Sequence, residues 1–489
     1  MQKYNHIFFS AHLDDVIGSC GQTISKLLQS GERICVVTIF AGDGGHDLSA
    51  FAKRLHTRWK IEDSSASIRR QEDISACKCL GVDFKHLNFS DAIYRKSENN
   101  FLYTSSVDLF SKIHNVDLNT KKSISKKILS IIKNNSATLY FPMGFGGHVD
   151  HKMLHDVGLN ILKQDCNKDI RFYRDFSYRN KFSRIPAYSF SVKSSKEHLQ
   201  NKINAFNKYK SQISTLFGTI DNMYKYFVRF KETFYTFTDI TVITVSRGRS
   251  QIIDRAIRSV RKQTIFNRIF HLIIIDDCVD TLRFLEQKYN NDHKIKWIYV
   301  ARNTKDTNGP VHLAKLRNFA IRNTRTKWVS MLDDDNEYEP KHLQYLFEFA
   351  AKTNFDLVHS WHKKFFWDGK PFLEKYWPYN KDKNEQKAKY IDYVRRGILQ
   401  PGSNIVKDGF DNNTIDTSVW LTKTKTILNY PYPENISKKE TINNMTEDKK
   451  FYQSIVNSGL AIGCNKKTTM RYYLGGYSTE FNTVLNRGT

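Results

Sequence analysis

Two short clusters of His and Asp in the first half of the sequence have the composition of a metal site. The segment SAHLDDV (residues 10–16) offers one His and two Asp, and GHVDH (residues 147–151) offers two His and one Asp. Zinc binds His nitrogen and carboxylate oxygen, and a catalytic zinc leaves one position open for water. Neither cluster is sufficient alone, but together they supply three ligands and additional acid–base groups. Since zinc lowers the pKa of water to about 7, such a site can hydrolyse an amide.

Carboxylates in the second half of the sequence are typical of a different metal site. Asp276 and Asp277 follow one apolar run, and the acidic segment Asp333–Asn336 follows another. Hard divalent cations prefer carboxylate ligands. A cation that bridges diphosphate oxygens neutralises the charge that develops when the bond to a nucleotide leaving group breaks. The ordered set therefore indicates transfer of a sugar from a nucleotide donor.

Both halves of the chain begin with a strand, a helix and a second strand. In the first half these elements are expected over residues 6–10, 17–28 and 34–40, and in the second half over 240–245, 252–260 and 272–275. Apolar residues at helical spacing between two apolar runs indicate a βαβ unit. Chemistry in such units lies at the carboxyl ends of the strands, which is where the His and Asp clusters fall. Gly144, Gly146 and Gly147 would let the loop before the second His cluster approach a ligand closely.

The chain of 489 residues is long enough for two domains. We predict an α/β protein with two Rossmann-like domains, spanning residues 1–237 and 238–489. Residues 193–237 have a polar, helical pattern, and no Gly/Pro-rich linker follows them. The polar segment 380–390 is expected to form a surface loop or an exposed helix inside the second domain.

The composition limits the partners of the chain. A net charge of +26 favours anions such as nucleotide diphosphates and phospholipid head groups. Lys and Arg are scattered without a nucleic-acid-binding motif, so nucleic acid is the less favoured partner. Seven Cys in no disulfide-like array, no signal-peptide pattern and no apolar run of about 20 residues together predict a cytoplasmic protein. A membrane-bound acceptor would be reached by peripheral contact through the basic surface.

The first half resembles the PIG-L/LmbE-like family of zinc N-acetylglucosaminyl deacetylases, over about residues 4–235. The family motifs His-Pro-Asp-Asp-Glu and His-x-Asp-His match residues 12–16 and 148–151, and RRQEDISACKCLGV, NFSDAIYR, FYRDFSY and NAFNKYKSQ follow the family order. The resemblance implies zinc ligands His12, Asp15 and His151, Asp14 as general base, and His148 as the residue that stabilises the oxyanion or protonates the leaving amine. It further implies that Asp150 orients His148 or a ligand and that Arg69 and Asp91 lie at the substrate.

The first motif departs from the family pattern at two positions. Leu13 stands where the family has Pro, and Val16 stands where it has Glu. Neither position is an implied ligand, so we expect the metal geometry to be kept. His155, one helical turn beyond His151, is expected to be a surface or core residue.

The second half resembles the family 2 glycosyltransferases with the GT-A fold, over about residues 239–480. The matching segments are SRGRSQIIDRAIRSVRKQT, IIIDDC with Cys278 in place of Gly, the block from Gly309 to Leu343, and TEDKKFYQSIVNSG. The resemblance implies that Asp276 and Asp277 contact the nucleotide, that Asp333 and Asp335 with Asp334 form the Mn²⁺ or Mg²⁺ and diphosphate site, and that Arg317 and Asn318 line the donor site. The metal pair is Asp333 and Asp335 or, one register along, Asp334 and Asp335. Asp448 or, as the second choice, Glu447 would be the general base of an inverting transfer, and Trp361, His362 and Trp367 would shape the acceptor pocket.

Together the resemblances imply a bifunctional enzyme. It would transfer a sugar, expected to be an N-acetylhexosamine from a UDP-sugar, to a glycan, glycolipid or small-molecule glycoside, and it would hydrolyse the N-acetyl group of an amino sugar. One alternative is a glycosyltransferase whose first domain is a catalytically dead binding module, which would lack stoichiometric zinc. Another is a nucleic-acid-binding protein, for which binding would depend strongly on salt.

Overall fold

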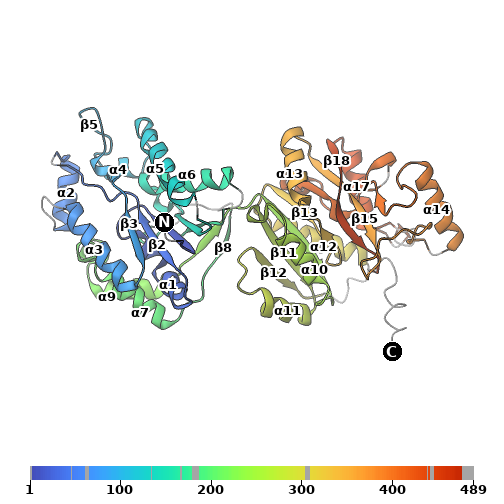
Figure 1. The fold of residues 1–489 in the computed structure, drawn as a ribbon, viewed down its shortest axis with the longest axis horizontal. Coiled ribbons are helices and arrows are strands. Elements are labelled where there is room, and N and C mark those ends of the chain that lie inside the picture. Colours follow the sequence, from blue (N-terminus) through green and yellow to red (C-terminus); the bar gives the residue numbers. More distant parts are fainter. Residues whose placement is uncertain are drawn as a thin grey trace. The chain divides into compact units, whose positions relative to one another are not determined.

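The computed structural model describes residues 3–45, 47–60, 65–133, 135–165, 168–178, 187–302, 309–380, 382–412, 414–437, 439–440 and 445–475. The chain divides into two compact units, Met1–Phe237 and Thr238–Thr489. Figure 1 shows a separate sheet with its own covering helices in each unit.

The first unit is built on a seven-stranded sheet in the order β3-β2-β1-β6-β7-β9-β8. Strands β3 to β7 along this order are parallel, whereas β9 runs antiparallel to both β7 and β8. The strands are β1 His6–Ser10, β2 Ile34–Thr38, β3 Asp83–His86, β6 Thr138–Pro142, β7 Ile170–Tyr173, β8 Tyr188–Phe190 and β9 Phe234–Thr236, and a small ribbon pairs β4 Lys96–Ser97 with β5 Asn100–Phe101.

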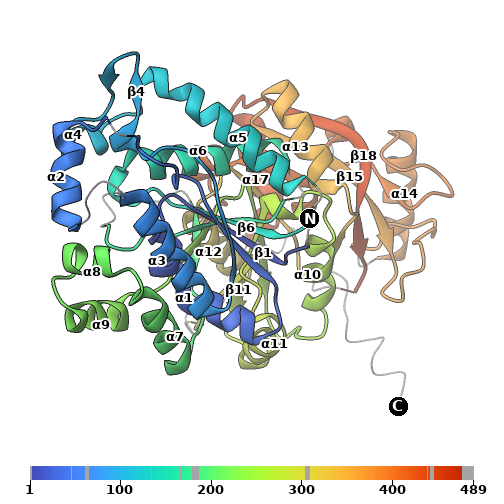
Figure 2. The ribbon, with the colours of Figure 1, turned by 60° about the vertical axis from the view of Figure 1, so that its left-hand side comes forward.

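Helices cover both faces of this sheet because successive side chains of a strand point to opposite faces. Ile7 and Phe9 join a core with α5 and α6, whereas Phe8 joins a second core with α1, α3, α7 and α9. Figure 2 shows these two helical layers on either side of the strands. The helices are α1 Asp15–Gln29, α2 Ala50–Trp59, α3 Ser65–Leu80, α4 Ser106–Leu109, α5 Leu118–Ile132, α6 Val149–Gln164, α7 Lys196–Phe206, α8 Lys210–Leu216 and α9 Ile220–Arg229.

The second unit is built on a mixed sheet in the order β12-β11-β10-β13-β17-β15-β18-β14, with β16 paired to β15. Strands β10 to β13 are parallel to one another, and β17 is antiparallel to its neighbours. The strands are β10 Ile240–Ser246, β11 Ile269–Asp276, β12 Ile295–Val300, β13 Trp328–Met331, β14 Glu337–Tyr338, β15 Leu357–Phe365, β16 Ile405–Val406, β17 Trp420–Lys423 and β18 Ile462–Tyr473. The helices are α10 Ile253–Arg261, α11 Val279–Tyr289, α12 Gly309–Arg322, α13 His342–Thr353, α14 Lys383–Arg395, α15 Thr424–Asn429 and α17 Glu447–Asn457.

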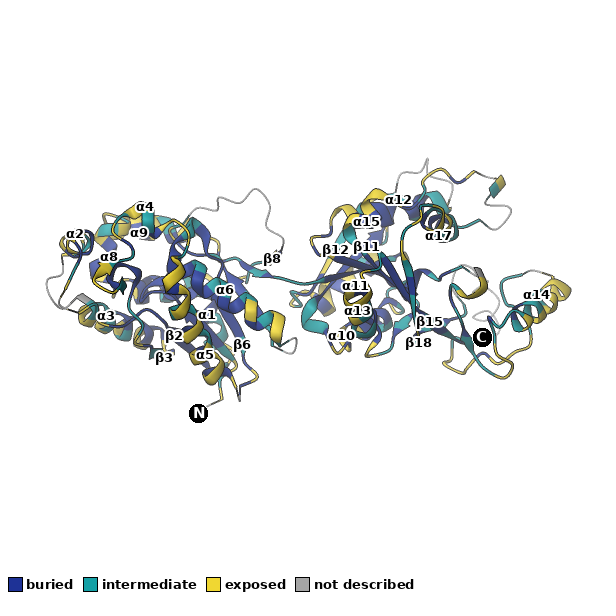
Figure 3. Cartoon of the chain, turned by 90° about the horizontal axis from the view of Figure 1, so that it is seen from above, coloured by how far each residue is buried: buried dark blue, intermediate teal, exposed yellow. Residues whose placement is uncertain are grey.

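The predicted α/β class with two Rossmann-like domains is confirmed, and each sheet has a parallel core that antiparallel strands extend. Central strands such as β1 and β11 are buried, the edge strands β3 and β12 are partly exposed, and the outer sides of the helices are exposed, as Figure 3 shows. The polar segment near residue 380 forms the largely exposed helix α14, which begins after Asp382, whose carboxylate accepts hydrogen bonds from the backbone of Asn384 and Glu385. Within the described part of the chain, none of the helices has the length and apolarity needed to span a bilayer.

Candidate active sites

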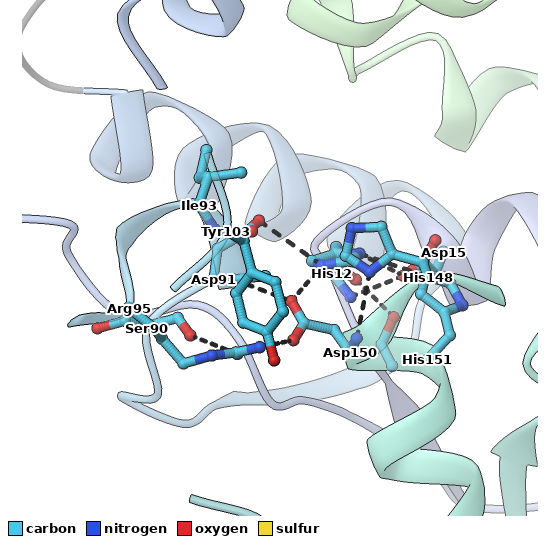
Figure 4. Close-up of polar contacts among 12 residues, drawn as sticks. His12, Asp15, Ser90, Asp91, Ile93, Arg95, Tyr103, His148, Asp150 and His151 are labelled. Carbon is cyan, nitrogen blue, oxygen red and sulfur yellow. Dashed lines mark hydrogen bonds and ion pairs between the residues drawn. The ribbon is translucent and has the colours of Figure 1, made fainter. Parts of the chain in front are cut away.

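Three side chains of the first unit converge on one point. Oδ2 of Asp15 lies 3.2 Å from Nδ1 of His12 and 3.2 Å from Nε2 of His151, and the two nitrogens are 3.3 Å apart. Figure 4 shows His12, Asp15 and His151 facing one another. A tetrahedral zinc with bonds of about 2.0–2.1 Å places its ligand atoms about 3.3 Å apart. The donor set and its spacing therefore fit a single zinc ion, with a fourth position left for water.

The topology of the sheet brings these residues together. Strands β1 and β6 are parallel neighbours, so the segments that follow them meet at one edge of the sheet. Asp15 opens α1 after β1, while Asp150 and His151 lie in the first turn of α6 after β6. Gly146, in the loop before α6, has a φ of +79°, and a Cβ there would lie 2.3 Å from the Tyr178 ring. This loop position accordingly requires glycine.

Two buried carboxylates hold His12 and His151 in orientation. Nε2 of His12 lies 3.1 Å from Oδ2 of Asp150, and Nδ1 of His151 lies 2.6 Å from Oδ1 of Asp175. Each carboxylate fixes one ring nitrogen so that the other faces the metal position, an arrangement that metal-bound His usually needs. The structure thus places Asp150 against the ligand His12, whereas His148 accepts a hydrogen bond from the backbone N–H of Asp150 at 3.2 Å.

Asp175 and Arg95 belong to this site and were missed in the sequence. Arg95 contacts Oδ1 of Asp150 at 2.5 Å and Oδ2 of Asp117 at 2.9 Å. This ion pair already engages the carboxylate of Asp150. The second group of possible metal ligands, His12, His148 and Asp150, therefore suits a metal ion less well than His12, Asp15 and His151. Asp175 follows β7, which is the parallel neighbour of β6. An Asp shortly after an apolar strand is the sequence feature by which it could have been predicted. Arg95 follows a 3-10 helix and carries no comparable signal.

The remaining predicted residues surround the metal position. Asp14 is buried, and Nη2 of Arg69 lies 3.4 Å from its Oδ1. Burial and the neighbouring Asp15 raise the pKa of Asp14 to about 6, which suits a group that takes and returns a proton near neutral pH. Burial, followed by the charge of His12, holds the pKa of His148 well below its usual range, so this imidazole is neutral. Asp91 lies 3.6 Å from Nε2 of His12.

His155 takes no part in this arrangement. Its Nδ1 lies 3.2 Å from the carbonyl oxygen of Pro142, and its ring packs edge-on against Phe172. These contacts tie α6 to β6 and β7.

In the second unit, the acidic segment after β13 is held by two arginines. Arg249 contacts Asp334 at 2.9 Å and Asp335 at 2.7 Å, and Arg317 contacts Asp333 at 3.0 Å. Burial and the charge of Asp335 raise the pKa of Asp334 to about 7. The three carboxylates thus lie together at the end of a central strand, where their negative charge is only partly balanced. Arg249 lies beyond β10 and was not predicted.

Of the other predicted donor-site residues, Asp276 and Asp277 lie at the end of β11, and Asn318 lies in α12. Asp276, at the end of β11, accepts a hydrogen bond from Nε2 of His312 at 2.9 Å. Asp277 has a φ of +48° and accepts a hydrogen bond from the Tyr299 hydroxyl at 2.8 Å. Asn318 donates from its amide to the backbone oxygen of Tyr432, so in this structure it fixes a neighbouring loop.

The two acidic residues at the start of α17 have different environments. Glu447 is buried and contacts Nη1 of Arg317 at 2.6 Å, so its carboxylate is engaged. Asp448 accepts a hydrogen bond from the Thr446 hydroxyl. Its negative charge is one of the causes that raise the pKa of Asp333, after burial and the charge of Asp335. Asp416, which the sequence did not single out, is a third candidate acid, because burial and the charge of Asp333 raise its pKa well above the usual range.

The aromatic residues expected at the acceptor have separate contacts. His362 pairs with Asp408 at 2.7 Å. The guanidinium carbon of Arg255 lies 4.4 Å from the centre of the Trp367 ring, and the Lys407 ammonium lies 5.7 Å from the Trp361 ring. Arg255 also donates a hydrogen bond to the backbone oxygen of Asp335, which links Trp367 to the acidic segment.

The two units match different protein families. Residues 7–162 match the PIG-L family, described as GlcNAc-PI de-N-acetylase, and residues 241–403 match glycosyl transferase family 2. The chain is 30% identical over 239 residues to the 2'-N-acetylparomamine deacetylase of Niallia circulans, a match that covers 44% of this chain and 83% of that protein.

Two further comparisons cover one unit each. The uncharacterized glycosyltransferase RC0461 of Rickettsia conorii is 27% identical over 163 residues, covering 33% of this chain but only 22% of that protein. The crystal structure of the zinc-inhibited form of the teicoplanin deacetylase Orf2 is 26% identical, with a TM-score of 0.42, and the match covers 47% of this chain and 96% of that structure.

Proposed function

We propose one reaction for each unit, from the premise that the chain belongs to the PIG-L family through its first unit and to glycosyl transferase family 2 through its second. The first unit hydrolyses the N-acetyl group of an amino sugar at a zinc site. The observation that carries this proposal is the convergence of His12, Asp15 and His151 at 3.2–3.3 Å. The name of the Niallia circulans relative, an N-acetylparomamine deacetylase, supports an N-acetylated glycoside as the substrate class.

The residues around the metal position have distinct roles in this hydrolysis. His12, Asp15 and His151 would hold the zinc, which would supply the Lewis acidity that activates water and polarises the acetyl carbonyl. The Asp14 carboxylate accepts the proton of the attacking water, and Arg69 holds that carboxylate in place. Neutral His148 donates a hydrogen bond to the oxyanion, and Asp14, once protonated, returns the proton to the leaving amine.

The second unit transfers a sugar from a nucleotide-sugar donor to an acceptor hydroxyl. Mn²⁺ or Mg²⁺, held within Asp333, Asp334 and Asp335, would neutralise the diphosphate leaving group. Arg317 adds positive charge at the same place, and Asp276 and Asp277 contact the nucleotide. Asp448 takes the proton of the acceptor hydroxyl in a single, inverting displacement. The position of these residues at the ends of β11 and β13, in α12 and at the start of α17 supports the proposal, as do the contacts of Arg317 with Asp333 and Glu447.

The two reactions are linked if the transferred sugar is an N-acetylhexosamine from a UDP donor, which the first unit then deacetylates. A catalytically dead first unit is the alternative, and the buried carboxylates that hold both His ligands argue against it. Product mass spectrometry of an Asp14→Ala variant and an Asp335→Ala variant tests the link. Acetylated product that accumulates only with Asp14→Ala supports transfer before deacetylation, whereas identical products from wild type and Asp14→Ala would refute the deacetylase.

A further inference from the structure

An apolar ladder lies exposed on the α8–α9 hairpin of the first unit. Ile220, Tyr224 and Val228 recur every four residues along α9 and are 55%, 48% and 53% exposed, and Leu216 at the end of α8 is 37% exposed. The apolar residues on the inner side of α9, Met223 and Phe227, are fully buried in the core. Single exposed apolar residues are normal on a protein surface, but a continuous row indicates an interaction site.

Positive charge borders this ladder. At 100° per residue, Lys225 lies about 60° and Arg229 about 100° around α9 from Val228, so both cations border the Val228 side of the ladder and lie far from Ile220. Over residues 208–231, five basic side chains are exposed and the single acidic residue is Asp221; the basic residues are Lys208, Lys210, Lys225, Arg229 and Lys231. Among the described residues, none of these five cations has a recorded ion pair.

A groove opens at the carboxyl-terminal end of the ladder. Its volume is about 740 Å³, and its lining includes Val228, Arg229, Lys231, Lys193 and Ser194. The groove therefore continues the apolar ladder into a hollow with three cationic side chains, four hydroxyl residues and one carboxylate, Glu232, which is paired with the buried Lys202 at 2.8 Å. Its size and charge fit a phosphate-bearing head group, with the apolar part of the same molecule along α9.

We propose that the α8–α9 hairpin and this groove bind the surface of an anionic lipid bilayer. The apolar ladder enters the boundary between head groups and acyl chains, and the flanking cations contact lipid phosphates, which is the pattern of an interfacial amphipathic helix. A second copy of the chain is a poorer occupant, because self-association through this face would bring five cations against five. A nucleic acid would satisfy the cations but leave the ladder without an apolar partner. The inference does not depend on the proposed reactions.

Vesicle co-sedimentation of the full chain tests the proposal. We expect binding to phosphatidylcholine vesicles that contain phosphatidylglycerol, little binding to phosphatidylcholine alone, and weakening by salt. An Ile220→Ser/Val228→Ser variant should bind at least about tenfold more weakly, because two half-exposed aliphatic side chains no longer leave water. A Lys225→Glu/Arg229→Glu variant should lose a similar part of its affinity for the vesicles.

A control variant and three contrary results distinguish membrane binding from binding of free phosphate or of a second copy of the chain. An Ile391→Ser/Lys387→Glu variant on α14, where Ile391 is 65% exposed, makes the same kinds of change elsewhere and should bind vesicles like wild type. Circular dichroism and thermal unfolding check that all variants fold. The proposal is overturned by vesicle binding that the α9 variants leave unchanged, by its abolition with inorganic phosphate at constant ionic strength, or by a dimer that Ile220→Ser/Val228→Ser dissociates.

Discussion

Asp175 lies 2.6 Å from Nδ1 of His151 and turns Nε2 of that ring toward Asp15 and His12. The carboxylate is 1% exposed, and its other oxygen accepts a hydrogen bond from the backbone of Phe145. It is therefore a rigid support for His151.

Asp175→Asn should weaken zinc binding by about 10- to 100-fold, because an amide orients His151 less well than a carboxylate. Competition with a chelator of known affinity measures the change. Asp156→Asn, which removes an exposed carboxylate paired with Lys121, is the control and should leave zinc affinity unchanged. Equal affinity in the Asp175→Asn variant would show that Asp175 does not support the metal site.

The base of the transfer reaction can be identified among three neighbouring acids. Asp448→Asn should lower kcat for sugar transfer by about 100-fold or more and leave binding of the nucleotide product unchanged, because it removes only the proton acceptor. Initial rates and calorimetry measure the two quantities. If Asp416→Asn causes this loss and Asp448→Asn does not, the assignment to Asp448 is wrong.

The buried pair of Arg317 and Glu447 should be coupled in stability. Arg317→Met leaves Glu447 buried without its partner, which costs about 3–5 kcal/mol for an ion pair of this kind. Adding Glu447→Gln should recover part of the loss. Denaturant unfolding of the two single variants and the double variant gives the coupling energy, and strictly additive losses would contradict the pairing.

The second unit should lose stability as the pH falls below about 6.5. Burial lowers the pKa of His271 and of His342 to about 3, so the folded unit keeps both neutral while the unfolded chain protonates them. Each His residue then lowers the free energy of unfolding by up to about 1.4 kcal/mol for every pH unit between its pKa in the unfolded chain and its pKa in the folded unit. Unfolding midpoints at pH 7 and pH 5 measure the effect.

A His271→Gln/His342→Asn variant is the control for this pH dependence. Its amide groups place a hydrogen-bonding nitrogen near the positions that contact Thr244 and Thr469 but do not titrate. The variant should show a smaller difference between pH 7 and pH 5 than wild type. The same difference in both proteins would assign the pH dependence to other groups.

Local sequence patterns were sufficient to predict the α/β fold and the two clusters that make up the candidate metal site. Strands such as β1 and β10 are short apolar runs that end in polar turns, and parallel pairing then places residues 12–15 and 148–151 at one sheet edge. Both patterns are visible within a few residues, which is why they could be predicted.

The supporting residues could not be predicted in the same way. Arg95 contacts Asp150, 55 positions away, and Arg249 contacts Asp334 and Asp335, 85 and 86 positions away. A lone Arg in a loop has no spacing that distinguishes it from a solvent-exposed one. Asp416 becomes unusual only through its burial beside Asp333, which depends on the packing of segments distant in sequence.

The most direct test of the deacetylase is acetate release from N-acetylated glycosides by the zinc-loaded chain, with zinc content measured on the same samples. The structure predicts one zinc per chain in wild type, acetate release from at least one glycoside, and loss of release with zinc retained in Asp14→Ala. Wild type that neither binds zinc nor releases acetate would contradict the account and assign catalysis to the second unit alone.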